Sequence, residues 1–170
     1  MDKKYIKLNN SDDVLKLYIQ TKDGEETGEY LEFDMEDIDL LDNLQKMQDD
    51  LVKNHNWLRN QFAIIEKKQD FTRKDKLMSN NEKMKYDAIK SFYNKQKEIY
   101  NMFLGENGVE KLLYGRKLEW NTIKEIEDII ENQIVPELNK VFDNITKKVK
   151  EKYGNIKTEE IEVVKWKKYK

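Results

Sequence analysis

The sequence predicts an α+β protein that is mainly α-helical, with a small antiparallel β unit at its N-terminal end. Two patterns support this prediction. Short runs of alternating apolar and polar residues occupy positions 1–35, whereas apolar residues recur at spacings of three and four from position 38 onward. The chain has 170 residues, 38% hydrophobic and 39% charged, which suits a single domain of helices with wide solvated faces.

Residues 1–35 are expected to form an antiparallel β meander. Two runs rich in Tyr, Ile and Val, at 3–8 and 14–20, are separated by a cluster of turn-forming residues, and a third strand is predicted at 29–33. In the second run apolar residues alternate with polar ones, which predicts one buried face. Such a small sheet is only marginally stable by itself, so other elements must cover its apolar face.

Residues 36–103 are expected to form an α-helical hairpin. Asp34 is placed as the N-cap of the first helix, because helical periodicity follows it. Residues 70–78 lack periodicity and are predicted to be a loop. Ser79, followed three positions later by Glu82, has the spacing of a capping box and marks the start of the second helix.

Residues 104–121 are expected to form a glycine-rich apolar connection. Gly105 suits the left-handed position that follows a helix, while Gly108 opens a short helix and Gly115 closes it. Two interpretations of the bulky residues crowded here stay open: all belong to the core, or some line a groove for an amphipathic helix of a partner. The candidate partner-binding residues are Met102, Phe103, Leu104, Leu112, Leu113, Tyr114 and Trp120.

The C-terminal part is expected to be a kinked helix at 122–154, followed by a basic tail at 155–170. Pro136 lies inside the helical pattern. Because proline removes a backbone hydrogen bond and clashes with the preceding turn, a kink or break is predicted near 132–136.

The composition argues against several classes of function. The chain has no cysteine, its single histidine has no second histidine with which to share a metal, and no glycine-rich loop between a strand and a helix is available to hold phosphate. We therefore expect no catalytic activity, no metal and no cofactor. No apolar run approaches ~20 residues and Met1 is followed by charged residues, so no membrane segment is expected and a cytoplasmic location is predicted.

The charge is nearly balanced overall but unevenly distributed. The net charge of −2 creates no field that attracts nucleic acid, and the short basic tail around Trp166 and Tyr169 does not make nucleic acid the favoured partner. Residues 1–36 carry five lysines and ten acidic residues, whereas residues 146–170 carry nine lysines and four acidic residues. These opposite charges allow the two ends to attract each other or a neighbouring copy, so a homo-oligomer is one open alternative.

The connection also carries a family resemblance. The run Phe103-Leu104-Gly105-Glu106-Asn107-Gly108, followed by Lys111-Leu112-Leu113-Tyr114-Gly115-Arg116-Lys117, is similar to tail assembly chaperones, small tail proteins of long-tailed phages and prophages of low-GC Gram-positive bacteria. The stretch from Gly28 to Asp34 resembles their opening, and the resemblance extends over residues 3–135. The chain departs from the pattern at Leu118-Glu119-Trp120-Asn121, where the family has an aromatic-rich segment that contains methionine.

This resemblance implies a non-catalytic function in phage tail morphogenesis. The expected partner is the tape-measure protein or another phage tail protein. The family role is to hold the long helical tape-measure protein soluble in the host cytoplasm while tail-tube subunits polymerise around it. An alternative stays open, a phage-encoded protein inhibitor of a host defence system, because such inhibitors are also small, acidic and non-catalytic.

Overall fold

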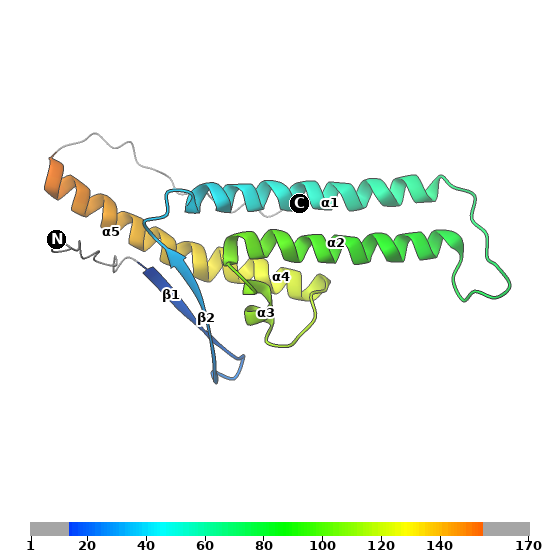
Figure 1. Ribbon diagram of the computed structural model, residues 1–170, viewed down its shortest axis with the longest axis horizontal. Coiled ribbons are helices and arrows are strands. Elements are labelled where there is room, and N and C mark those ends of the chain that lie inside the picture. The colour runs from blue at the N-terminus through cyan, green and yellow to red at the C-terminus, as the bar shows by residue number, and fades with distance from the viewer. Residues whose placement is uncertain (1–13, 155–170) are drawn as a thin grey trace, which may run out of the picture.

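The computed structural model describes residues 14–154, of which 65% are helical. The elements in chain order are β1 (Val14–Gln20), β2 (Glu26–Asp34), α1 (Leu40–Glu66), α2 (Asn80–Leu104), α3 (Gly108–Leu113), α4 (Trp120–Ile129), the π-helical turn η1 (Ile130–Ile134) and α5 (Val135–Tyr153). Figure 1 shows α1 and α2 side by side as a long hairpin, with the strands and C-terminal helices gathered at one end. The predicted mainly helical α+β fold is confirmed.

Within the described residues the sheet consists of two antiparallel strands, β1 and β2. Leu17 lies opposite Leu31, and Leu31 and Phe33 are buried on the face turned toward the helices. The pairing is irregular between Tyr18 and Gln20, where extra residues of β2 bulge. The strand predicted at 3–8 lies outside the described residues.

Helix α1 begins later than predicted, at Leu40, and Asp34 is the last residue of β2 rather than a helix cap. The Asp34 carboxylate accepts a hydrogen bond from the backbone N–H of Glu36, and the Asp37 carboxylate accepts one from Asp39, both at 2.9 Å. Aspartate side chains that bind nearby backbone donors compete with the helix for those donors. The acidic segment therefore forms turns, and the helix starts after them.

The hairpin is held together by apolar side chains at helical spacing along both helices. The buried residues of α1 include Leu44, Met47, Leu51 and Ile65, and those of α2 include Phe92, Ile99, Tyr100 and Phe103. This core continues onto the sheet and the C-terminal helices, where Leu31, Phe33, Ile126, Ile130 and Leu138 join it. The strands are thus covered on one face, as their size requires.

A buried chain of polar groups crosses the hairpin near its middle. The Asn54 amide donates to the Gln96 side-chain carbonyl at 2.8 Å and to the backbone carbonyl of Phe92 at 3.2 Å. Gln96 donates to the Tyr100 hydroxyl at 3.4 Å, and this hydroxyl donates to the Glu127 carboxylate of α4 at 3.3 Å. Gln96 and Tyr100 are fully buried. Because a buried amide is costly to leave unpaired, this chain fixes the register of the hairpin.

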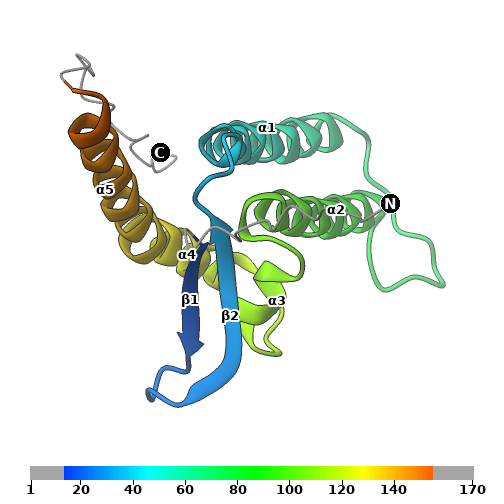
Figure 2. The same cartoon turned by 60° about the vertical axis from the view of Figure 1, so that its left-hand side comes forward.

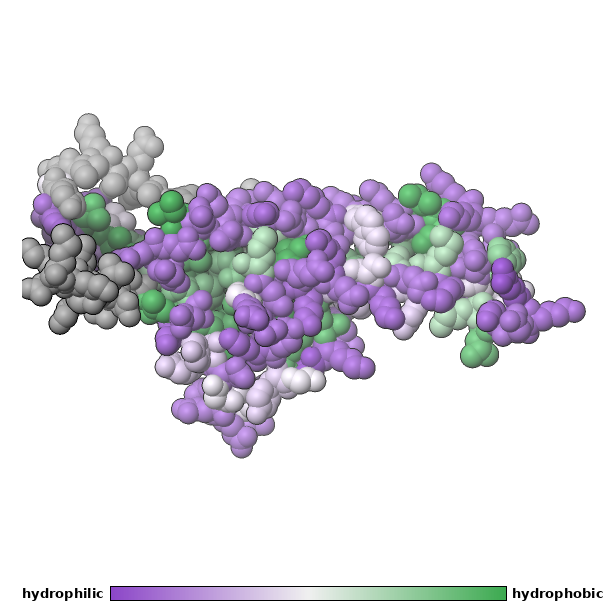
Figure 3. All heavy atoms as spheres, viewed as in Figure 1, coloured by the Kyte–Doolittle hydropathy of each residue, from purple (hydrophilic) through white to green (hydrophobic). Residues whose placement is uncertain are grey.

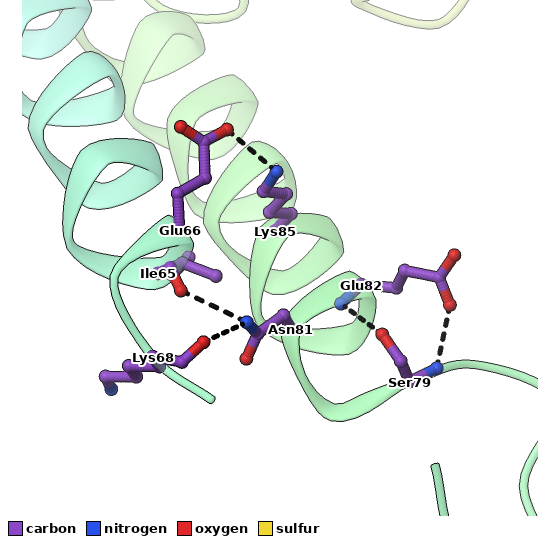
Figure 4. A network of polar contacts seen from close by, with 7 residues as sticks. All are labelled: Ile65, Glu66, Lys68, Ser79, Asn81, Glu82 and Lys85. Atoms are coloured by element: carbon purple, nitrogen blue, oxygen red, sulfur yellow. Dashed lines mark hydrogen bonds and ion pairs between the residues drawn. The ribbon is translucent and has the colours of Figure 1, made fainter. Parts of the chain in front are cut away.

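Side chains at the start of α2 close the loop end of the hairpin, as Figure 4 shows. The Ser79 hydroxyl accepts from the backbone N–H of Glu82 at 3.2 Å, and the Glu82 carboxylate accepts from the backbone N–H of Ser79 at 2.7 Å, which is the predicted capping box. The Asn81 amide donates to the carbonyls of Ile65 and Lys68 at 3.1 and 3.0 Å. These bonds pair backbone groups that helix ends leave without intrahelical partners.

Two glycines turn the chain from α2 into α3, each for its own reason. Gly105 has φ 88° and ψ 179°, a region nearly restricted to glycine, so the predicted left-handed helical conformation is wrong there although a glycine is still required. At Gly108 a Cβ atom would lie 2.4 Å from the Cβ of Leu104. One glycine is therefore needed for its backbone angles and the other for close packing.

The structure has α4, η1 and α5 in succession where one kinked helix was predicted at 122–154. The first of them, α4, starts at Trp120, two residues before the predicted boundary. The Thr122 hydroxyl accepts from the backbone N–H of Glu119 at 2.8 Å, and the Glu119 side chain in turn accepts from the backbone of Thr122. This reciprocal cap places the helix start earlier. Figure 2 shows that α5, which follows α4 and η1, diverges from the hairpin.

The disturbance predicted around Pro136 takes the form of the π-helical turn η1. Proline lacks the N–H that would close the preceding turn, and that turn widens before α5 continues. Ile130, Ile134 and Leu138 stay buried across the wide turn. The π turn thus accommodates the proline without removing these residues from the core.

Gly105→Ala and Gly108→Ala are each expected to lower the free energy of unfolding by about 1–3 kcal/mol, the first through backbone strain and the second through overpacking against Leu104. Urea denaturation measures both. Glu106→Ala, at an exposed position between them, is the control and should change stability by less than about 0.5 kcal/mol. A Gly108→Ala protein as stable as this control would show that α3 does not need the close contact.

Asn54→Leu should destabilise the protein by about 1–3 kcal/mol, because it leaves the Gln96 carbonyl buried without its donor. Adding Gln96→Leu should cost less than the sum of the two single changes, and a double-mutant cycle in urea measures the difference. Asn56→Leu, at an exposed position on the same helix, serves as the control. Strict additivity of the two changes would contradict the role given to the amide pair.

Candidate partner-binding surfaces

The seven residues predicted to bind a partner do not share one surface. Three are core side chains: Phe103, Leu104 and Leu113. One is half-buried and packs against the core: Leu112. The other three side chains are exposed: Met102 at 36%, Tyr114 at 59% and Trp120 at 49%. The connection is therefore partly core and partly surface.

Phe103 is in the core because the end of α2 faces the sheet. Its ring centroid lies 5.4 Å from that of Phe33 on β2. Leu113 and Val109 of α3 are buried in the same cluster. Because α3 and the last turn of α2 carry apolar residues on several sides, spacing alone does not distinguish their inner from their outer faces.

Tyr114 lies at the end of α3 in a left-handed conformation, with φ 46° and ψ 60°. Its backbone N–H donates to the carbonyl of Glu110 at 3.0 Å, which closes the short helix. Few residues other than glycine, asparagine and aspartate adopt this conformation, so a bulky tyrosine is unusual here. Tyr114 is exposed and borders a shallow pocket together with Arg116 and the turn after β1.

Trp120 lies at the start of α4, against the side of the hairpin. Its ring centroid is 6.0 Å from that of His55, which is 5.0 Å from Phe92, and the Lys124 ammonium lies 5.7 Å from the Trp120 ring. Burial, with the nearby Arg59 guanidinium, lowers the pKa of His55 below its ordinary value of 6.5. A neutral imidazole thus joins the aromatic contact.

A groove of about 530 Å³ lies between α1 and α2 on another face of the hairpin. Its lining includes Asn54 and Trp57 from α1 and Lys95 and Ile99 from α2. Trp57 is partly exposed, and Met102 lies one turn beyond Ile99 along α2. A shallow surface between two helices that offers separate apolar side chains is suited to receive a third helix.

A wider crevice of about 910 Å³ separates β1 from α4, η1 and α5. Residues 16–22 line one side, and the other side includes Ile129, Gln133 and Pro136. Leu112 of the predicted set also borders it. This crevice was not predicted, because it depends on how the C-terminal helices lie across from the strand.

The sequence analysis also missed the loop end of the hairpin. Leu77 is fully exposed, and Phe71 and Met78 are about half exposed, beside the basic residues Arg73 and Lys76. Figure 3 shows hydrophobic residues at this end of the hairpin among hydrophilic ones. The signal was available in the sequence: large apolar residues stood in a stretch predicted to be a loop.

Stability should fall as the pH drops below about 6.5, because unfolded His55 takes up a proton at its ordinary pKa while folded His55 takes it up only at lower pH. The loss should level off once the pH passes below the folded pKa. Urea denaturation between pH 7.5 and 5 measures it, and His55 is the only histidine in the chain. His55→Gln should remove this part of the slope, and an unchanged slope would assign it to carboxylates.

Searches for metal-binding groups and membrane-spanning helices covered the described residues, and the whole chain was compared with known proteins. Between residues 14 and 154, no group of three His, Cys, Asp or Glu side chains is placed to hold a metal ion. Over the same residues, no helix has the length and apolar character needed to cross a membrane. No protein-family model, curated protein or solved structure matches this chain.

Proposed function

We propose that this chain is a non-catalytic binding protein of phage tail assembly, a chaperone that holds the tape-measure protein in the host cytoplasm. One observation supports this proposal most directly: Tyr114, in the run that carries the family resemblance, and Trp120, in the segment just after it, expose about half of their surface. Tyrosine and tryptophan are enriched in protein interfaces, where their large rings supply much of the binding energy.

The arrangement suits a helical partner. An amphipathic helix presents apolar residues at intervals of three and four and binds through a few anchors surrounded by polar groups. Around Tyr114 and Trp120 the chain offers such polar groups, including Arg116 and Lys124. The groove between α1 and α2, with Trp57 at its border, provides a second place for a helix.

The limited exposed area also suits a chaperone. A stable interface commonly buries about 1,200–2,000 Å² in total, and separate aromatic anchors cover much less than this. A partner held by them would be released readily, as it must be when tail subunits assemble. Reversible binding of a long helix is thus compatible with the few exposed side chains seen here.

Tyr114→Asp is expected to abolish co-purification with the tape-measure protein of the phage or prophage that encodes this chain. The melting temperature should stay nearly unchanged, because the side chain is exposed and aspartate tolerates the left-handed conformation. Tyr86→Asp is the matched control, since Tyr86 is a similarly exposed tyrosine on α2, and this variant should still bind.

Two results would contradict the proposal at different levels. If the unmodified chain does not retain the co-expressed tape-measure protein, the chaperone function is wrong. If the unmodified chain binds but the folded Tyr114→Asp protein binds with unchanged affinity, Tyr114 is not part of the surface, and Trp120→Asp becomes the next variant to compare.

A further inference from the structure

Two apolar side chains at opposite ends of α1 are exposed to solvent and take no part in the proposed tape-measure contact. Leu77, in the loop after α1, is fully exposed, and Ile38, in the turns before α1, is 90% exposed. Met35 and Leu40 on either side of Ile38 are buried, so the turns leave Ile38 outside the core. A single exposed apolar side chain is common on protein surfaces, so the surroundings of each one decide whether it belongs to a contact.

Leu77 borders a hollow of about 650 Å³ at the loop end of the hairpin. Three of the lining side chains are large, apolar and half to fully exposed: Phe71, Leu77 and Met78. Three others are basic and one is acidic: Arg73, Lys76, Lys83 and Asp75. An apolar centre with a polar rim is the arrangement found in contacts between proteins.

The loop that forms this hollow carries an excess of positive charge. Residues 67–78 contain five basic and two acidic residues, although the whole chain has a net charge of −2. Lys76 is paired with Asp75, and Lys83 beside the hollow is paired with Asp87 on its own helix. The other four basic side chains of the loop form no ion pair with any residue between 14 and 154: Lys67, Lys68, Arg73 and Lys74. These four are available for an acidic partner.

The turns before α1 carry the opposite charge. Residues 34–42 contain five acidic residues and no basic one. All five are exposed, and none is ion-paired in the part of the chain that the structure describes: Asp34, Glu36, Asp37, Asp39 and Asp42. Ile38 is thus an exposed apolar side chain among unpaired carboxylates. A hollow with an apolar centre and basic groups at its rim is complementary to it.

These two surfaces cannot meet within one molecule. The acidic turns precede α1 and the hollow follows it, and Figure 1 shows them at opposite ends of the hairpin. The 27 residues of α1 span roughly 40 Å, at about 1.5 Å per residue. The complementary turns can therefore reach the hollow only from a second copy of the chain.

We propose that the hollow at the loop end binds the turns 34–42 of a second copy, with Ile38 seated among the three apolar side chains of the hollow. The carboxylates around Ile38 then face the basic residues of the loop. Such a contact joins different surfaces of two identical chains, so a pair still has one unused hollow and one unused turn and can add further copies. The contact does not depend on the proposed tape-measure function, because it includes neither Tyr114 nor Trp120.

Analytical ultracentrifugation of the full chain, at about 10 μM to 1 mM, should show oligomers that grow with concentration and decline with salt, because the contact is small and charged. Ile38→Asp and Leu77→Asp should each weaken association by about tenfold or more at an unchanged melting temperature, since both side chains are exposed. Val52→Asp, at an exposed apolar position in the middle of α1, is the matched control and should associate like the unmodified chain.

Two results of this measurement would overturn the proposal. One is an unmodified chain that stays monomeric over the whole range of concentration. The other is an unmodified chain that associates while the Ile38→Asp or the Leu77→Asp protein associates equally well, because another surface would then join the copies.

A mixture of the two variants tests the head-to-tail arrangement. The Ile38→Asp chain keeps an intact hollow and the Leu77→Asp chain keeps an intact acidic turn, so equal amounts of both should associate again. The product should stop at a dimer, because the remaining turn and the remaining hollow are both defective. Variants that stay monomeric when mixed, or that form oligomers as large as those of the unmodified chain, would contradict the proposed contact.

Charge exchange tests why the acidic turns are the occupant. A chain with Arg73→Glu and Lys74→Glu, and another with Glu36→Lys and Asp39→Lys, should each associate less than the unmodified chain, because like charges then meet in the contact. Mixing the two should restore association, since the acidic hollow of one meets the basic turn of the other. Unchanged association of either chain alone, or no recovery in the mixture, would overturn the pairing of charges on which the proposal depends.

Discussion

The buried polar chain from Asn54 through Gln96 and Tyr100 to Glu127 is the constraint on which the arrangement of helices depends. Apolar contacts between long helices permit sliding, since one large apolar side chain can replace another at the next turn. An amide must meet its partner within hydrogen-bond distance, or a buried group stays unpaired at a cost of about 1–3 kcal/mol. Because this series of hydrogen bonds ends at Glu127 on α4, it fixes both the register of the hairpin and the position of the C-terminal helix.

The exposure of Trp120 and the crevice beside β1 both follow from that placement. With α4 held against the hairpin, Trp120 lies beside His55 and exposes about half of its surface. The same helix continues through η1 opposite β1, and the crevice lies between them. The π-helical turn keeps Ile130 and Ile134 in the core despite Pro136, so the wall of the crevice remains continuous.

The sequence predicted most of the fold but not the surfaces, and particular residues show why. Periodicity found the hairpin, and Ser79 with Glu82 marked the start of α2, because both signals are local. Asp34 was misread as a helix cap, since aspartates bind backbone donors in turns as readily as at helix ends. Phe103 and Tyr114 look alike in the sequence, yet one is core and the other exposed, and only the tertiary contact with Phe33 separates them.

The structural roles of the residues in the resembling run limit what the resemblance to tail assembly chaperones can say about function. Gly105 is required by its backbone angles and Gly108 by the contact with Leu104, while Phe103 fills the core, so the turn between α2 and α3 is enough to explain these residues. A shared partner has to act on residues that the fold does not need. Tyr114 is such a residue, since it is exposed and its left-handed backbone would suit asparagine or glycine better. The case for a common partner therefore depends on this tyrosine more than on the glycines beside it.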